Sequence, residues 1–184
     1  MRILGISGSL RRESYNTKLL LTAGTLLPDE VELVRWDGLK AVPPYDEDDD
    51  GELAPDGVAA LRDAISGADA IMFATPEYNS SIPGQLKNAI DWASRPLATN
   101  VLRNKPVAVV GVSTGMFGGV WSQAELRKVL AATGARVVQG ECAVGQAPTR
   151  FAEDGRLIDE ELVARLASVV AALVAEAIPV ALAA

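Results

Sequence analysis

The stretch AIMFATPEYNSSIPGQLKNAIDWA, residues 70–93, contains the pattern of a strand, a loop and a helix in succession. Residues 70–74 are all apolar, which is typical of a parallel strand that is buried on both faces. From Leu86 onward the apolar side chains recur every three or four residues, which predicts a helix. The polar loop 76–84 therefore lies where a strand ends and its crossover helix begins. Ligands bind at this edge of open α/β sheets.

The same alternation of apolar strands and amphipathic helices runs through the rest of the chain. The predicted strands are Arg2–Ile6, Val31–Arg35, Ala70–Ala74, Val107–Val112 and Arg136–Val138. The predicted helices are Thr17–Leu27, Asp56–Ser66, Gly84–Ser94, Trp121–Ala132 and Asp159–Ala177. Five parallel strands with short right-handed crossovers allow few arrangements, chiefly the order 2-1-3-4-5 or part of a dinucleotide-binding fold. We expect one α/β domain over residues 1–184.

The composition excludes several kinds of chemistry. The 184 residues, 49% apolar and 22% charged, are typical of one soluble domain. The chain has no histidine, which removes Ser-His and Cys-His catalysis and His-ligated zinc. The single cysteine, Cys142, excludes an internal disulfide and is expected to be a buried small hydrophobe. An enzyme with so few reactive side chains would have to take its chemistry from a cofactor.

Charge and hydropathy argue against nucleic-acid and membrane partners. The net charge of −7 does not suit a nucleic-acid surface, and the short apolar run at the N-terminus indicates a cytoplasmic protein without a signal peptide. Residues 162–184 are apolar, but charged residues and Pro179 interrupt them, and their stripe of apolar side chains predicts a helix packed on the sheet. The acidic residues 46–52 lack EF-hand spacing, which indicates a solvated segment rather than a metal site.

The first of three polar loops, residues 8–16, precedes a predicted helix. A helix N-terminus presents unpaired amide donors, and Ser9, Ser14 and Asn16 add short polar groups. Arg11 adds a guanidinium that suits phosphate. The spacing matches neither GxGxxG nor GxxxxGK[ST], so the dinucleotide and NTPase motifs are both excluded. The pattern predicts a phosphate cradle, and the alternative is a helix cap with solvated arginines.

The second and third loops could hold a flat ligand. In the loop after residue 75, Glu77 and Asn79 offer polar groups and Tyr78 offers a planar ring, while two prolines stiffen the backbone. The loop 113–120 has three glycines that permit close approach of a ligand, and Ser113 and Thr114 can hydrogen-bond to it. Taken singly, each loop could also be an ordinary turn.

Together the three loops resemble those of the NADPH-dependent FMN reductase family, flavodoxin-like proteins that include quinone, azo-dye and chromate reductases. The matching motifs are GSLR at 8–11 with Ser14 and Asn16, PEYN at 76–79, SIPG at 81–84, LKNAIDW at 86–92 and STG at 113–115. The resemblance extends to about Val138. It implies a flavodoxin-like three-layer sandwich whose five-stranded parallel sheet, in the order 2-1-3-4-5, has helices on both faces.

The resemblance also implies ten cofactor-binding residues, no catalytic side chain and no metal, because the flavin carries the chemistry. The residues implied to bind the FMN phosphate are Ser9, Arg11, Ser14 and Asn16. The residues implied to line one side of the isoalloxazine ring are Pro76, Glu77, Tyr78 and Asn79. Ser113 and Gly115 are implied to contact the other side of the ring. The implied reaction is hydride transfer from NADPH or NADH through FMN to a quinone, a similar acceptor or free flavin.

Family members are homodimers or homotetramers, which implies an interface at the helix after Gly84, with Leu86 and Trp92 as contacts. Trp121 departs from the family because many members carry Arg there, and Ser80 stands where relatives often have an aromatic residue. The resemblance leaves open which nucleotide is preferred, and whether FMN is a prosthetic group or an exchanged substrate.

Two alternatives share this fold. A flavodoxin-type electron carrier would bind FMN without oxidising NAD(P)H, but Arg11 and the low aromatic content of 5% favour an open enzyme site. A receiver-type regulatory domain needs acidic residues after the first strand and an Asp after the third. The sequence has Ser7-Gly8 and Pro76-Glu77 at those places, which argues against this class.

Overall fold

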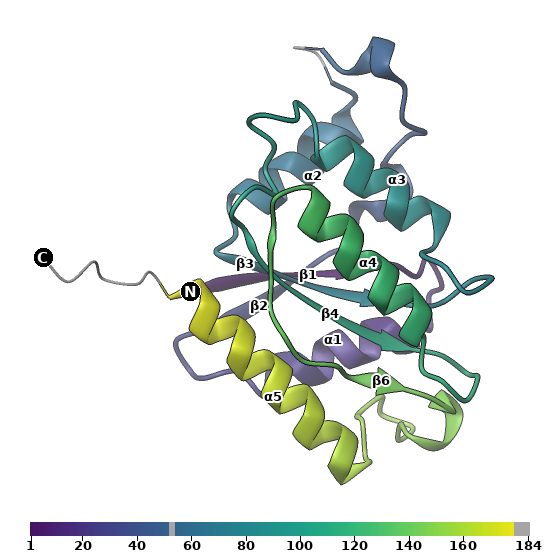
Figure 1. The fold of residues 1–184 in the computed structure, drawn as a ribbon. Helices are drawn as coiled ribbons and strands as arrows, with labels where there is room; N and C mark the ends of the chain where they lie inside the picture. The colour runs from purple at the N-terminus through teal and green to yellow at the C-terminus, as the bar shows by residue number, and fades with distance from the viewer. Residues whose placement is uncertain (52–53, 179–184) are drawn as a thin grey trace, which may run out of the picture.

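A parallel sheet forms the middle layer of the molecule, and helices cover both of its faces (Figure 1). This computed structural model describes residues 1–51 and 54–178. Five strands lie in the order β2-β1-β3-β4-β5, which confirms the predicted order. They are β1 (Arg2–Ser7), β2 (Glu32–Trp36), β3 (Ala70–Thr75), β4 (Pro106–Val112) and β5 (Arg136–Val137).

The helices divide between the two faces as the crossover rule requires. One face carries α1 (Tyr15–Thr25) and α5 (Glu160–Ala177). The other carries α2 (Asp56–Ser66), α3 (Gly84–Ala93) and α4 (Val120–Ala132). Short 3-10 helices occur at Gly38–Ala41 (η1), Glu47–Asp49 (η2) and Ala147–Thr149 (η3). All five predicted helices are present, with ends within two residues of those predicted.

A sixth strand, β6 (Ala143–Val144), was missed by the sequence prediction of five strands. It pairs with β4 beyond β5, and between the two short strands the chain moves away from β4. Arg127 of α4 fills this gap, because its guanidinium donates to the carbonyl of Val109 at 2.7 Å and to those of Val138 and Gly140. A two-residue strand is too short to show a period of two.

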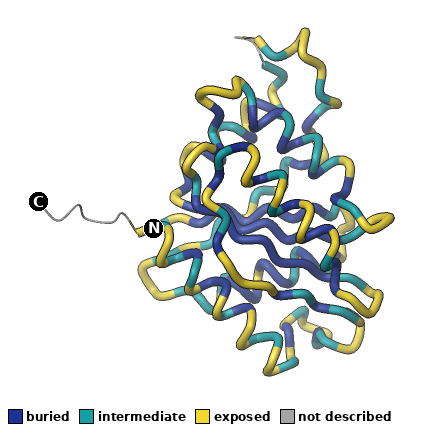
Figure 2. Tube along the Cα trace, viewed as in Figure 1, coloured by how far each residue is buried: buried dark blue, intermediate teal, exposed yellow. Residues whose placement is uncertain are grey.

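The core lies on both faces of the sheet, where every residue of β3 and β4 is buried (Figure 2). The apolar stripe of α5 packs inward as predicted, with Leu166 and Leu173 fully buried. Cys142 is also buried, which confirms its expected role, and burial raises the pKa of its thiol to about 11. In the described part of the chain no helix is long and apolar enough to span a membrane.

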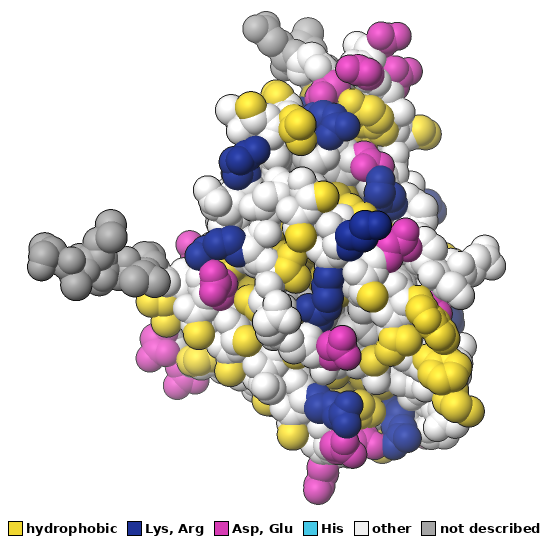
Figure 3. All heavy atoms as spheres, viewed as in Figure 1, with side chains coloured by type: hydrophobic (Ala, Val, Ile, Leu, Met, Phe, Trp, Pro, Cys, Tyr) yellow, Lys and Arg dark blue, Asp and Glu magenta, His cyan; other side chains and the backbone are white. Residues whose placement is uncertain are grey.

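Charged side chains of both signs are spread over the visible surface (Figure 3). The acidic segment is exposed from Asp46 to Asp49, while Asp50 forms an ion pair with Arg62 at 2.7 Å. Glu52 and Pro179 lie outside the described residues. Within 1–51 and 54–178, no three acidic or cysteine side chains gather in a way that could hold a metal ion.

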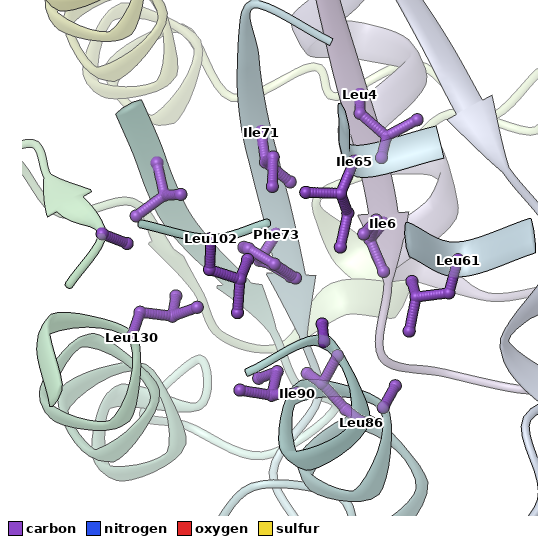
Figure 4. Packing of buried hydrophobic residues seen from close by; sticks show 14 of the residues in the cluster. Leu4, Ile6, Leu61, Ile65, Ile71, Phe73, Leu86, Ile90, Leu102 and Leu130 are labelled. Carbon is purple, nitrogen blue, oxygen red and sulfur yellow. The ribbon is translucent and has the colours of Figure 1, made fainter. Parts of the chain in front are cut away.

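The prediction that Leu86 and Trp92 form a subunit contact is wrong. Leu86 points from α3 into the core beside Ile90 (Figure 4), and it is 1% exposed. Trp92 is fully buried, and its indole N–H donates to the carbonyl of Pro43 at 2.9 Å. Both side chains are used inside the domain, because the apolar face of α3 packs on the sheet and on the segment after β2.

Candidate functional site

A cleft, called here the main cleft, lies at the carboxyl edge of the sheet where β1, β3 and β4 end. Its volume is about 120 Å³. All three predicted loops contribute to it, and eight of the ten predicted binding residues line it. These eight are Ser9, Arg11, Ser14, Asn16, Pro76, Glu77, Tyr78 and Ser113. Asn79 and Gly115 do not line it.

The loop after β1 folds on itself before α1 begins. Ser9 accepts a hydrogen bond on its hydroxyl from the backbone N–H of Arg11, and Ser14 is the N-cap of α1 because its hydroxyl accepts from the N–H of Thr17. The helix-cap alternative is therefore correct for Ser14. The cap satisfies only one of the first amides of α1, so the others remain available as donors at this end of the cleft.

Asn16 joins the loop after β1 to the loop after β4. Its side chain donates to the carbonyl of Val112 at 3.1 Å and accepts from the N–H of the same residue at 3.0 Å. The side chain is 4% exposed. Because both the NH2 group and the oxygen of the side-chain amide are hydrogen-bonded to Val112, Asn16 holds the wall of the cleft in position. The predicted contact of Asn16 with a ligand could use only the second hydrogen of its NH2 group.

Arg11 differs from Asn16 because its side chain is exposed. Within the described ranges it forms no ion pair and no side-chain hydrogen bond. In a protein of net charge −7 this is a local positive group at the mouth of the cleft. A guanidinium without an internal partner is suited to a bidentate contact with an anion.

The loop after β3 is a tight hairpin turn. Tyr78 and Ser81 exchange two backbone hydrogen bonds of 3.1 and 3.2 Å, and the two residues between them have positive φ, 53° at Asn79 and 60° at Ser80. Positive φ at both central positions is the type I′ arrangement, in which asparagine is common. Asn79 is therefore at the exposed tip, which explains why it does not line the cleft.

Two carboxylates fix this loop to α4. Glu77 accepts from the backbone N–H of Trp121 at 3.0 Å and of Ser122 at 3.1 Å, so it caps the start of the helix. Glu125 of α4 in turn accepts from the hydroxyl of Ser81 at 2.6 Å. A negative group at a helix N-terminus is favoured by the helix dipole. The carboxylate of Glu77 thus has a structural task that its position in the sequence did not reveal.

The loop after β4 turns away from the cleft soon after it begins. Ser113 accepts on its hydroxyl from the N–H of Gly115, and the carbonyl of Gly115 accepts from the N–H of Gln146 at 2.8 Å. Gly118 and Gly119 have φ of 62° and 78°, which only glycine adopts without strain in most contexts. Because the carbonyl of Gly115 is bonded to Gln146, Gly115 packs against the segment after β6.

Two lining residues, Tyr15 and Val112, were missed by the sequence prediction, whereas Thr114 was identified as a possible hydrogen-bonding group but not counted among the ten binding residues. Each is adjacent to a residue that was identified or follows it closely. Tyr15 is the first residue of α1 and packs against Phe151 with 5.3 Å between ring centroids. Phe151 lies in the part of the chain beyond the matching motifs, so no local pattern indicated this support.

Exposed apolar side chains gather next to the cleft, at the start of α4. Met116 is 72% exposed, Phe117 58%, Trp121 49% and Tyr78 50%. The rings of Phe117 and Trp121 meet edge to face at 5.1 Å. Figure 3 shows hydrophobic side chains grouped on this side of the molecule.

The strand order and the three loops at the ends of β1, β3 and β4 define a flavodoxin-like protein with a mononucleotide-type cleft. Residues 1–149 match the family described as NADPH-dependent FMN reductase. The chain belongs to this family, which confirms the resemblance inferred from its motifs.

Similar proteins are consistent with this assignment. The chain is 41% identical over 162 residues to an NAD(P)H-dependent FMN reductase of Pseudomonas aeruginosa, covering 88% of this chain and 86% of that one. It is 39% identical over 156 residues to a quinone reductase of Pseudomonas putida, covering 84% and 83%. Among solved structures, the flavoenzyme FerB, an NAD(P)H:(acceptor) oxidoreductase from Paracoccus denitrificans, is 36% identical with a TM-score of 0.85, covering 96% of each chain.

Proposed function

We propose that the protein is an FMN-dependent reductase that transfers two electrons from NADPH or NADH to a small-molecule acceptor such as a quinone or free flavin. The observation that carries this proposal is the main cleft of a member of this family, in which Arg11 lies beside the N-terminus of α1 and its side chain bonds to none of the residues 1–51 and 54–178. The names of the similar proteins support the same reaction.

The donors of the main cleft fit the phosphate of FMN. The hydroxyl of Ser9, the first amides of α1 and the guanidinium of Arg11 are all hydrogen-bond donors at one end of it. The volume of about 120 Å³ is below the range of roughly 300–1,000 Å³ that encloses a whole small ligand. The cleft therefore suits the phosphate end, while Pro76 and Tyr78 at its rim suit the flavin ring.

When bound, FMN supplies the two-electron chemistry, as acceptor and donor of hydride. The protein's part is to bind and orient it. Arg11 compensates the phosphate charge, and the turn 78–81, fixed to α4 by Glu77 and Glu125, holds the rim in one position. The carboxylate of Glu77 accepts two backbone N–H groups on one of its oxygens, which supports a role in holding the loop in position.

The oligomeric state and the cytoplasmic location stay predictions. The apolar group of Tyr78, Met116, Phe117 and Trp121 supports a contact between copies of the chain beside the cleft. Such a contact would use the start of α4 in place of Leu86 of α3. Trp121, where many relatives have Arg, would then contribute apolar area rather than charge.

The test is to purify the protein, record its visible spectrum with added FMN, and follow oxidation of NADPH and NADH with benzoquinone or free FMN as acceptor. We expect flavin absorbance to be retained by the protein and turnover with at least one acceptor. Bound flavin without NAD(P)H oxidation would instead identify an electron carrier. A protein that binds no flavin would contradict the proposal.

A further inference from the structure

A second cleft, called here the basic cleft, adjoins the main cleft at the carboxyl end of β2. Its volume is about 320 Å³. Four cations and one carboxylate are among its lining residues, and these are Arg11, Arg12, Arg35, Lys40 and Asp37. Such an excess of positive charge is unusual in a protein of net charge −7.

The one carboxylate of the basic cleft is already neutralised. Both oxygens of Asp37 contact the guanidinium of Arg35 at 2.6 Å, and this hydrogen-bonded pair raises the pKa of Arg35. Arg11, Arg12 and Lys40 form no ion pair with any residue that the structure describes. Because Arg11 is assigned to the phosphate of FMN, Arg12 and Lys40 are the two cations left to attract a second anion, and a phosphate dianion suits such a pair.

An aromatic ring lines the same cleft. Trp36, the last residue of β2, is half-buried and packs over Gly38, where a Cβ atom would stand 2.5 Å from the indole ring. Any larger residue at position 38 would displace the ring, so its orientation depends on this glycine. A flat ring beside cations is suited to a purine base that carries a phosphate group nearby.

The basic cleft is connected to the flavin end of the site by a third cleft, which Leu10, Arg11, Tyr78 and Pro83 help to line. Leu10 and Arg11 also line the basic cleft, and Arg11 and Tyr78 also line the main cleft. The three clefts therefore share walls and adjoin one another between Trp36 and Tyr78. An extended dinucleotide could place one end near Trp36 and the other near Tyr78.

We propose that the basic cleft binds the adenosine 2′-phosphate of NADPH, with Lys40 and Arg12 contacting the phosphate and Trp36 contacting the adenine. This inference rests on the proposed reductase function, and it adds a preference for NADPH over NADH. The carboxyl end of the second strand is also where dinucleotide-binding folds distinguish a ribose hydroxyl from a 2′-phosphate. The site here is formed by different residues on a different fold.

The test compares steady-state kinetics of the holoenzyme and its Lys40→Ala variant with both nucleotides. Lys40 is exposed and lies outside the main cleft, so FMN affinity and turnover with NADH should stay within about twofold. We expect kcat/KM for NADPH to fall about tenfold, as for the loss of one charged contact to phosphate. Lys128→Ala, which removes an exposed lysine on α4, is the matched control and should change neither value.

A direct binding experiment separates this inference from the reductase proposal. Calorimetric titration with 2′,5′-ADP and with ADP requires no turnover, and we expect the 2′-phosphate to strengthen binding about tenfold in the wild type and not in Lys40→Glu. A wild type that oxidises neither nucleotide would overturn the reductase proposal alone. Equal binding of the two ligands, or equal loss of NADPH and NADH turnover in Lys40→Ala, would overturn the adenosine site.

Discussion

The inner wall and the outer rim of the main cleft use their polar groups in opposite ways. On the inner wall, Asn16 and Glu77 are hydrogen-bonded to backbone groups of the domain. On the rim, Arg11 has no internal partner in the described part of the chain. Both sets were predicted from the same motifs. We infer from this difference that a wall residue contributes to the stability of the fold and to the shape of the site. A rim residue contributes to ligand affinity alone.

The largest effect on stability should come from the wall. Asn16→Ala leaves the buried N–H and carbonyl of Val112 without partners, which should lower the free energy of unfolding by about 3 kcal/mol. Urea denaturation of the apoprotein measures this. FMN affinity should fall as well, because α1 loses its link to the end of β4.

Asn100→Ala is the matched control for Asn16→Ala. Asn100 is equally buried at 4%, and it also bonds backbone groups, including the carbonyl of Thr133. It precedes β4, at the edge of the sheet opposite the cleft. We expect a similar loss of stability with unchanged FMN affinity. If Asn100→Ala weakened FMN binding as much as Asn16→Ala, the effect would be one of general stability and the distinction between the regions would fail.

The rim should give the reverse result. Arg11→Ala removes a charged contact to phosphate, which should weaken FMN binding by about 2 kcal/mol, or roughly thirtyfold. The free energy of unfolding of the apoprotein should stay the same, because this side chain bonds to no described residue. Arg103→Ala, an exposed arginine before β4, should leave both quantities unchanged. Unaltered FMN affinity in Arg11→Ala would show that the phosphate is held elsewhere.

A smaller effect is expected at the other wall residue. Glu77→Ala removes the carboxylate that caps α4, so stability should fall by about 1 kcal/mol. Glu77→Gln keeps an acceptor oxygen and should lose about half as much. Thermal denaturation of both variants, beside an exposed control such as Glu153→Gln, measures this difference. Equal stability of all three variants would mean that Glu77 belongs functionally with the rim.

The sequence predicted the frame of the fold well, because its signals are local. The apolar runs in β3 and β4 and the stripe on α5 each report burial directly. The same periodicity did not identify what Leu86 and Trp92 pack against, because it distinguishes a buried face from an exposed one without naming the partner. The strand β6 was missed because two residues are too few to show the alternation of side chains that marks a strand.

The candidate site was predicted in outline for a similar reason. The spacing of the motifs predicted that the three loops lie at one edge of the sheet. It could not distinguish the residues that face the cleft from Asn79, which lies at the tip of a turn. The basic cleft was not visible in any motif. Trp36 and Lys40 meet Arg12 only because β2 lies beside β1, and strand adjacency is a property of the whole sheet.

The central claim is that the main cleft holds a flavin by its phosphate. The measurement that tests it most directly is a fluorescence titration of the apoprotein with FMN and with riboflavin, which lacks the phosphate. Two or three charge-assisted hydrogen bonds to the phosphate should make FMN bind about a hundredfold more tightly than riboflavin. Equal affinity for the two flavins would contradict the claim.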